Sequence, residues 1–188
     1  MNSTKPMKST HLRAQRGALE KLWQQGLSGQ ALLAEQSRLV DGFICQHFQE
    51  ATSDLSGSIA LVALGGYGRQ ELFPYSDIDL MILYQPEQLA EIKQVAEAIL
   101  YPLWDTGLEV GHAVRTVEES MDHADQDFFF QVAMLDARFL RGSQDLFDDL
   151  LARYRLRFIE GGREEFVHSM KAFRAARRKA FMLSQLSA

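Results

Sequence analysis

The stretch IALVALGGYGRQELFPYSDIDLMILY, from Ile59 to Tyr84, decides the fold of this chain. One apolar run ends abruptly in Gly65-Gly66, and a second begins inside the acidic triplet Asp77-Ile78-Asp79. Each run is too short for a buried helix and is bounded by turn residues, which predicts two buried strands. Because side chains on a strand alternate between its faces, Asp77 and Asp79 are expected to point the same way.

The acidic pair and the glycine turn together indicate a site for a metal and a phosphate. Carboxylate oxygens suit Mg²⁺, which usually keeps several waters and binds through one or two carboxylates plus substrate phosphates. Gly65 and Gly66 allow backbone N–H groups to approach a polyphosphate, and a helix after them would turn its positive end toward the anion. The alternative is that Asp77 and Asp79 are surface charges that serve solubility. The residues favour a metal-dependent enzyme that acts on a nucleoside triphosphate.

The composition of the 188 residues, 46% hydrophobic and 24% charged, is ordinary for a soluble globular protein. No apolar segment is long enough to span a bilayer, and the N-terminal residues lack the apolar region of a secretory signal. We therefore expect a cytoplasmic protein that does not bind membranes. Residues 41–150 carry five Lys or Arg against twenty Asp or Glu. This acidic middle argues against nucleic-acid binding, which needs a basic surface.

Hydrophobic periodicity and capping residues predict the remaining elements. Strands are expected at about residues 59–64, 78–83, 108–115 and 138–140. Helices are expected at about residues 11–25, 28–50, 67–72, 86–104, 144–159 and 163–183, with two more beginning at Thr116 and Asp125. The fold class expected is α/β (α+β), with a small mixed sheet of three to four strands and flanking helices. We expect an N-terminal helical segment at 1–56, a core at 57–142 and a C-terminal helical segment at 143–188.

The third predicted strand supplies a further carboxylate. Its residues Glu109, Gly111, Ala113 and Arg115 share one face, and the two small ones leave room for something to lie against the sheet. Nucleotidyl transfer needs metal-bound charge neutralisation and a carboxylate that helps to deprotonate the nucleophile. Glu109 is the candidate for a third carboxylate at the metal site. The alternative is an ordinary exposed glutamate on a strand.

Other polar residues near the glycine turn have two possible roles each. Arg69 is predicted to pair with triphosphate oxygens, or else to form a salt bridge with Glu71 or a loop carboxylate. Arg115 is predicted either to bind nucleotide or to have a structural role. Ser76 is predicted either to contact phosphate or to cap a turn. His112 is predicted to be a core histidine rather than a catalytic one. For Phe128-Phe129-Phe130, core packing is favoured over a base pocket.

Several motifs resemble the nucleotidyltransferase domain of the protein-PII uridylyltransferase/uridylyl-removing enzymes. The first are GGYGR at 65–69 and ELFPYSDIDL at 71–80, which contain the glycine turn and the acidic pair. Two further stretches agree, LWD at 103–105 with GLEVGHAVRT at 107–116, and Leu-Ser-Gly with its helix at 27–48. The similarity runs from about residue 12 to about residue 150, and the combination is far more specific than a glycine pair or an acidic pair alone.

The resemblance implies a polymerase-β-like nucleotidyltransferase core, with Gly65 and Gly66 at the triphosphate and Asp77 and Asp79 at magnesium. The implied reaction transfers UMP from UTP to a tyrosine hydroxyl of the nitrogen-regulatory protein PII and releases pyrophosphate. The expected partners are therefore a nucleoside triphosphate, with UTP favoured, and a PII-like acceptor protein.

The sequence also departs from the family. Members continue into a hydrolase domain that removes UMP and into domains that sense glutamine, so we expect an excised domain or a shortened relative, with the C-terminal segment truncated. Gln70 stands where a small residue is commoner. Two alternatives stay open: a nucleotidyltransferase of different base and target, and a nucleotide-binding regulatory module without turnover. The residues alone specify neither the base nor the acceptor.

Overall fold

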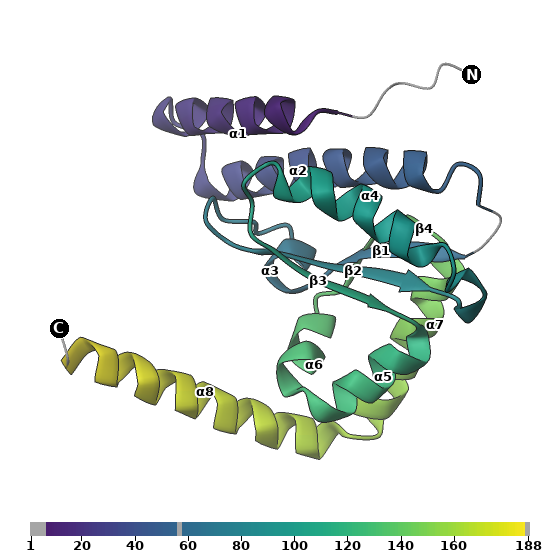
Figure 1. Ribbon diagram of the computed structural model, residues 1–188. Coiled ribbons are helices and arrows are strands. Elements are labelled where there is room, and N and C mark those ends of the chain that lie inside the picture. The colour runs from purple at the N-terminus through teal and green to yellow at the C-terminus, as the bar shows by residue number, and fades with distance from the viewer. Residues whose placement is uncertain (1–6, 56–57, 187–188) are drawn as a thin grey trace.

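A four-stranded mixed sheet forms the centre of the protein, in the order β3-β2-β1-β4 (Figure 1). The computed structural model describes residues 7–55 and 58–186. Strand β1 (Ile59–Ala63) is antiparallel to both β2 (Ile78–Tyr84) and β4 (Arg138–Gly142), whereas β2 is parallel to β3 (Val110–Arg115). The predicted α/β class with a small mixed sheet is confirmed.

One face of the sheet is covered by α2 (Gly29–Ala51) and α4 (Ile92–Trp104), and α1 (Ser9–Gln24) packs on the side of α2 that faces away from the sheet (Figure 1). Ile78 and Leu80 of β2 are buried on this face in a core that includes Phe43 of α2. Helix α2 matches the helix predicted at about residues 28–50, and Ser28 is its N-cap, since the Ser28 side chain accepts a hydrogen bond from the backbone N–H of Ala31. The predicted domain boundary at residue 56 lies outside the described residues.

The opposite face is covered by α5 (Val117–Gln126), α6 (Phe128–Met134) and α7 (Gln144–Tyr154). Met81 of β2 is buried there in a second core, together with Met121 of α5 and Phe147 of α7. The parity predicted for β2 is therefore correct, but the face that bears Asp77 and Asp79 is not free of helices. Only the first end of β2 leaves its carboxylates uncovered, since Asp77 and Asp79 are exposed whereas Met81 is buried.

The helices begin and end differently from the prediction at the glycine turn. The helix expected at 67–72 is instead α3 (Gly65–Gly68), a single turn. Gly65 opens it at φ +54°, and Gln70 lies beyond its end at φ +61°. Glycine adopts this left-handed conformation more readily than glutamine, because a side chain is strained there.

Two other predicted helix starts also change. Pro86 begins a separate 3₁₀ turn, η1 (Pro86–Gln88), rather than α4 itself. The cap of α6 is Asp127 rather than Asp125, since the Asp127 carboxylate accepts from the backbone N–H groups of Phe129 and Phe130. The helix start predicted at Thr116 is confirmed, since Thr116 and Glu119 form a capping box that begins α5.

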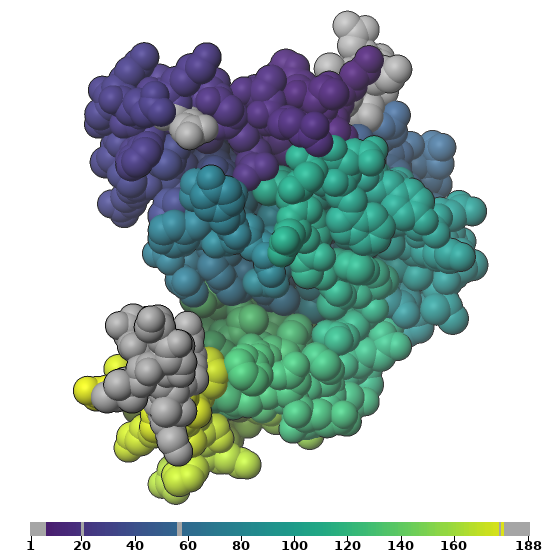
Figure 2. Space-filling view, turned by 60° about the vertical axis from the view of Figure 1, so that its left-hand side comes forward, coloured from purple at the N-terminus to yellow at the C-terminus, as the bar shows by residue number. Residues whose placement is uncertain are grey.

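The C-terminal part of the chain consists of two further helical segments. The π-helical segment η2 (Arg155–Glu160) follows α7, and the long helix α8 (Arg163–Leu186) comes after it. Figure 2 shows α1 and α2 at one end of this view of the surface and α8 at the other. Among the described residues, no helix combines the length and the apolar character that a membrane span requires.

Candidate active site

The carboxylate of Asp79 lies between two glycines from different parts of the chain. Asp79 is the register partner of Gly111 on β3, and its carbonyl accepts a 2.9 Å hydrogen bond from the N–H of Leu64. A Cβ on Gly111 would lie 2.8 Å from Oδ1 of Asp79, and a Cβ on Gly65 would lie 3.2 Å from Oδ2. The first separation is shorter than real Cβ contacts, so the carboxylate occupies space that only a glycine at 111 leaves open.

The negative charges of Asp77 and Asp79 repel each other. Partial burial raises the pKa of Asp79 above its ordinary value, and the charge of neighbouring Asp77 raises it further. A divalent cation between the two carboxylates would relieve that repulsion, since an adjacent positive charge favours the ionised form. The donor set therefore fits Mg²⁺, for which two carboxylates with water and phosphate oxygens are sufficient.

Glu109 lies at the same end of the neighbouring strand. Its carbonyl accepts a 2.9 Å hydrogen bond from the N–H of Ile78. Ile78 and Val110 are partners in the parallel register of β2 and β3, so Asp77 and Glu109, each one residue earlier, lie at the same end of these adjacent strands. The side chain is exposed. Among the described residues, no three His, Cys, Asp or Glu side chains form a group arranged to hold a metal ion. The role of Glu109 as a third carboxylate stays a prediction.

A cavity of about 370 Å³ opens beside Asp79. Gly111 and Ala113 line it, so the space predicted above these small residues is present. Arg115 lines it as well, with its guanidinium carbon 5.2 Å from the centre of the Phe130 ring. The far wall is formed by α5 and α6 through residues that the sequence did not single out as site residues, including His123 and Asp127.

The structure makes the salt bridge of Arg69 explicit. Its Nε is 2.8 Å from Oε2 of Glu71, and its Nη1 is 2.6 Å from Oδ2 of Asp136. These are the contacts of the alternative role, and a triphosphate would have to share the guanidinium with both carboxylates. The N–H of Ser76 donates to the carbonyl of Phe73 at 3.0 Å, as in a turn. Phosphate contacts by Arg69 and Ser76 stay predictions.

The aromatic and histidine assignments are resolved residue by residue. His112 is exposed and lies edge-on to Trp104 with ring centres 5.6 Å apart, so its prediction as a buried core histidine is wrong. It lies on the outermost strand β3, where the face that carries Val110 and Val114 is only partly covered. Phe130 is buried, as core packing predicts, whereas Phe129 is 68% exposed and lines the cavity.

The backbone of the glycine turn presents free donors. The N–H of Gly68 donates to the carbonyl of Leu64, and that of Arg69 donates to the carbonyl of Gly65. Within residues 7–55 and 58–186, no protein acceptor is recorded for the N–H groups of Gly65, Gly66 or Tyr67. The helix dipole expected here is small, because α3 is only one turn long. The free N–H groups, rather than a long helix, are what the turn offers an anion.

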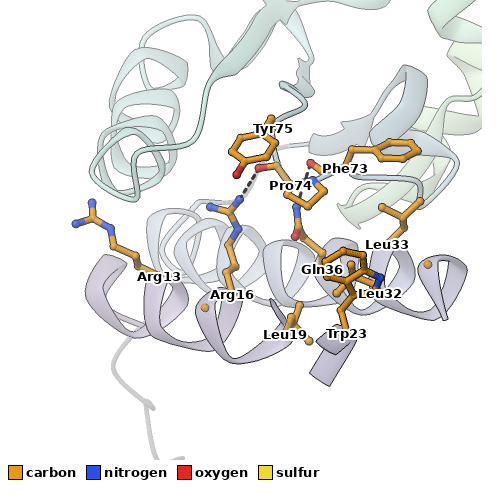
Figure 3. Close-up of a pocket in the computed structure, with 12 residues that line it drawn as sticks. Arg13, Arg16, Leu19, Trp23, Leu32, Leu33, Gln36, Phe73, Pro74 and Tyr75 are labelled. Atoms are coloured by element: carbon orange, nitrogen blue, oxygen red, sulfur yellow. Dashed lines mark hydrogen bonds between the residues drawn. The ribbon is translucent and has the colours of Figure 1, made fainter. Parts of the chain in front are cut away.

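A larger cavity, of about 580 Å³, lies between α1, α2 and the loop Phe73–Tyr75 (Figure 3). Its walls are mostly apolar, with Trp23 and Leu32 among them, and none of the described side chains that line it is a carboxylate. Arg16 on its wall donates to the carbonyl of Pro74 at 3.1 Å. Size alone does not identify the reactive site, and the smaller cavity beside Asp79 has the groups that phosphate chemistry requires.

Substitution of Gly111 by alanine tests the space that Asp79 occupies. The new Cβ would displace the Asp79 carboxylate, so we expect nucleotidyl transfer to fall at least about tenfold, as small misplacements at reacting groups do. Thermal stability should change little, because the atom that the new Cβ would meet is a side-chain oxygen at an exposed position. Gly17→Ala on α1, where nothing lies within 4 Å of the added Cβ, is the matched control. Equal transfer rates in both variants would contradict the arrangement.

Comparison with known proteins agrees with this geometry. Residues 44–126 match the family model described as nucleotidyltransferase domain. Over 142 residues, the chain is 44% identical to a bifunctional uridylyltransferase/uridylyl-removing enzyme of Nitrosospira multiformis, with 72% of this chain and 16% of the relative covered. An enzyme of the same description from Bradyrhizobium diazoefficiens is 47% identical over 121 residues, with 64% of this chain and 13% of the relative covered.

A third relative of that description, from Thiobacillus denitrificans, is 39% identical over 147 residues and covers 78% of this chain. The chain spans only 13 to 17% of the length of these three relatives. The matched family region begins within α2 and ends with α5, so it includes the glycine turn, the acidic pair and most of the cavity wall. Residues 44–126 of the chain therefore match a nucleotidyltransferase domain, and over most of its length the chain is similar to the bifunctional uridylyltransferase/uridylyl-removing enzymes.

Proposed function

We propose that this chain is the catalytic part of a magnesium-dependent uridylyltransferase. It transfers UMP from UTP to a tyrosine hydroxyl of a PII-like acceptor protein. The tyrosine oxygen bonds to the α-phosphorus, the bond from that phosphorus to the bridging oxygen breaks, and pyrophosphate leaves with the electron pair. The proton of the hydroxyl passes to a carboxylate, for which Glu109 is the candidate.

The observation that carries this proposal is the position of the acidic pair. Asp79 lies against Gly65 of the glycine turn and Gly111 of β3 and helps to line the cavity, and Asp77 stands two residues earlier, just before β2. Asp77 and Asp79 would hold Mg²⁺, which when bound neutralises charge on the phosphates and on the leaving pyrophosphate. The similarity to enzymes described as uridylyltransferases supports UMP as the transferred group.

The other residues of the site bind and orient the substrate. The free N–H groups of Gly65 and Gly66 donate hydrogen bonds to phosphate oxygens. Arg115, held over the Phe130 ring, offers a fixed positive charge inside the cavity. The exposed ring of Phe129 gives the base an apolar surface to lie against. These contacts place the α-phosphate beside the acidic pair and leave the open side for the acceptor tyrosine.

A labelling experiment tests base and acceptor together. The chain is mixed with Mg²⁺, a PII protein and either UTP or ATP that carries the label on the α-phosphate, and label on the acceptor is followed with time. We expect transfer from UTP and at least about tenfold slower transfer from ATP, the discrimination that a base-specific hydrogen bond provides. Removal of Mg²⁺ by a chelator should stop transfer.

An acceptor in which the modified tyrosine is replaced by phenylalanine is the control for the target atom, since it lacks the nucleophilic oxygen. Preferential labelling from ATP would contradict the assigned base and support a relative with different specificity. Magnesium-dependent nucleotide binding without release of pyrophosphate would contradict catalysis and support a regulatory binding module.

A further inference from the structure

The glycine turn depends on support from outside itself. Helix α3 is a single turn of four residues, and three of these are glycines. A lone helical turn fixes several dihedral angles for very few hydrogen bonds, and glycine adds to the entropic cost. Contacts from outside α3 must therefore hold this turn in its conformation.

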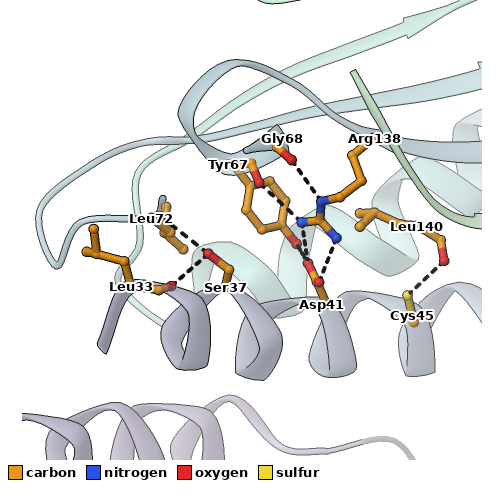
Figure 4. A network of polar contacts seen from close by, with 9 residues as sticks. All are labelled: Leu33, Ser37, Asp41, Cys45, Tyr67, Gly68, Leu72, Arg138 and Leu140. Atoms are coloured by element: carbon orange, nitrogen blue, oxygen red, sulfur yellow. Dashed lines mark hydrogen bonds and ion pairs between the residues drawn. The ribbon is translucent and has the colours of Figure 1, made fainter. Parts of the chain in front are cut away.

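Arg138 of β4 supports the other end of the turn (Figure 4). Its Nε donates to the carbonyl of Gly68 at 2.9 Å, and its Nη2 donates to the carbonyl of Tyr67 at 3.1 Å. The guanidinium carbon lies 5.4 Å from the centre of the Tyr67 ring. A planar fork of donors suits this task, because it engages both carbonyls in one orientation.

Asp41 of α2 fixes the guanidinium in turn. Its carboxylate accepts from Nη1 of Arg138 at 2.8 Å and from Nη2 at 3.1 Å, and the hydroxyl of Tyr67 donates to it at 2.6 Å. The side chains of Arg138 and Asp41 are only 24% and 20% exposed, so water screens the pair weakly. Asp41, Tyr67 and Arg138 thereby join α2, α3 and β4 at one point.

We propose that Arg138, held by Asp41, is a positioning residue that sets the glycine turn for binding of the nucleoside triphosphate. The inference rests on the proposed function and extends it to residues outside the cavity. Arg138 does not line the cavity beside Asp79, so it acts through the backbone of Tyr67 and Gly68 rather than by touching the nucleotide. This role also explains why the acidic residue Asp41 lies on α2 close to Val40 and Phe43, which are buried in the core.

Arg138→Lys in the 188-residue chain is the test variant, since lysine keeps the charge but cannot engage two carbonyls and Asp41 in the same plane. Arg141→Lys is the matched control. Arg141 lies on the same strand and donates to Gln49 of α2 at 2.9 Å, but it makes no recorded bond to the turn. Three quantities are measured on each protein: the thermal midpoint, the Kd for UTP with Mg²⁺, and amide hydrogen exchange of the peptide that contains residues 64–72.

We expect Arg138→Lys to remain folded, to bind UTP about tenfold more weakly, as loss of a charge-assisted hydrogen bond implies, and to exchange faster in the turn peptide. Where transfer is measured, KM for UTP should rise with little change in kcat. Arg141→Lys should match the unsubstituted chain in affinity and in exchange. If Arg138→Lys proves too unstable to measure, Asp41→Asn supplies the same comparison with the shape of the side chain retained.

A folded Arg138→Lys or Asp41→Asn protein with unchanged UTP affinity and unchanged exchange at 64–72 would overturn the inference. So would a loss of stability with no change of affinity in the folded fraction, since that is a purely structural role. If the unsubstituted chain binds neither UTP nor ATP, the proposed function fails. Faster exchange at 64–72 in Arg138→Lys alone would then still support the role of Arg138 in holding the turn. Equal exchange in Arg138→Lys and the unsubstituted chain would refute that role.

Discussion

Asp79→Asn should reduce UMP transfer by about 1000-fold or more, because it removes a charged ligand from a site that neutralises the transition state. Asp77→Asn should have an effect of the same kind, since both carboxylates project from one end of β2. Transfer is measured with the labelled nucleotide at saturating acceptor, over a range of Mg²⁺ concentrations. Full activity in both variants would contradict the metal site.

The same Asp79→Asn variant should be as stable as the unsubstituted chain at neutral pH, or slightly more stable. Burial and the charge of Asp77 raise the pKa of Asp79, so its ionisation opposes folding. The stability that its protonated form contributes is complete below the ordinary pKa of aspartate, about 4, and is lost as pH rises through the raised value. The gain at neutral pH should be less than about 1 kcal/mol, since water screens this exposed carboxylate.

Urea unfolding at several pH values measures that difference. The stabilities of the two proteins should converge as pH falls toward about 4, where both carry a neutral group at position 79. A variant that is inactive and still stable shows that activity is lost through chemistry rather than through unfolding. A large loss of stability in Asp79→Asn would show instead that this carboxylate supports the fold.

Gly68→Ala should cause the largest loss of stability among substitutions at the turn. A Cβ there would lie 2.0 Å from the carbonyl oxygen of Asp136 and 3.1 Å from that of Ala63. Both obstacles are backbone atoms, one before β4 and one in β1, and neither can move without disturbing the sheet. We expect a cost of about 3 kcal/mol, which corresponds to a fall of roughly 6 to 12 °C in Tm for a chain of this size.

Gly42→Ala on α2 is the control for this second substitution. Nothing lies within 4 Å of the added Cβ, and Gly42 is exposed inside a helix. Alanine should therefore stabilise the protein by about 0.5 to 1 kcal/mol. Equal Tm values for Gly68→Ala and the unsubstituted chain would mean that α3 does not lie as close to the Asp136 carbonyl as the structure has it.

Much of the fold follows from short-range patterns. The apolar runs at 59–64 and 78–83, bounded by turn residues, predicted β1 and β2, and capping residues predicted the starts of α2, α5 and α7. These predictions hold because strand alternation and helix capping involve residues that are near one another in the chain. The predicted start of α6 at Asp125 is wrong, because the actual cap is Asp127. Two aspartates lie within three residues there, and both satisfy the residue preference of a helix N-cap.

The candidate site likewise has one part that local sequence patterns predict and another part that they do not. The chain order of Gly65, Gly66, Asp77 and Asp79 and the alternation of β2 were enough to predict a metal and phosphate site with both carboxylates on one face. That Asp79 fits against Gly111, that Arg69 reaches Asp136, and that Arg138 reaches Asp41 depends on sheet register and on the packing of helices on both faces. Residues 67 and 97 positions apart meet there, and no local pattern specifies such distances. The stretch from Ile59 to Tyr84 thus supplies the residues expected to carry the chemistry, while the helices packed on both faces of the sheet hold these residues in place.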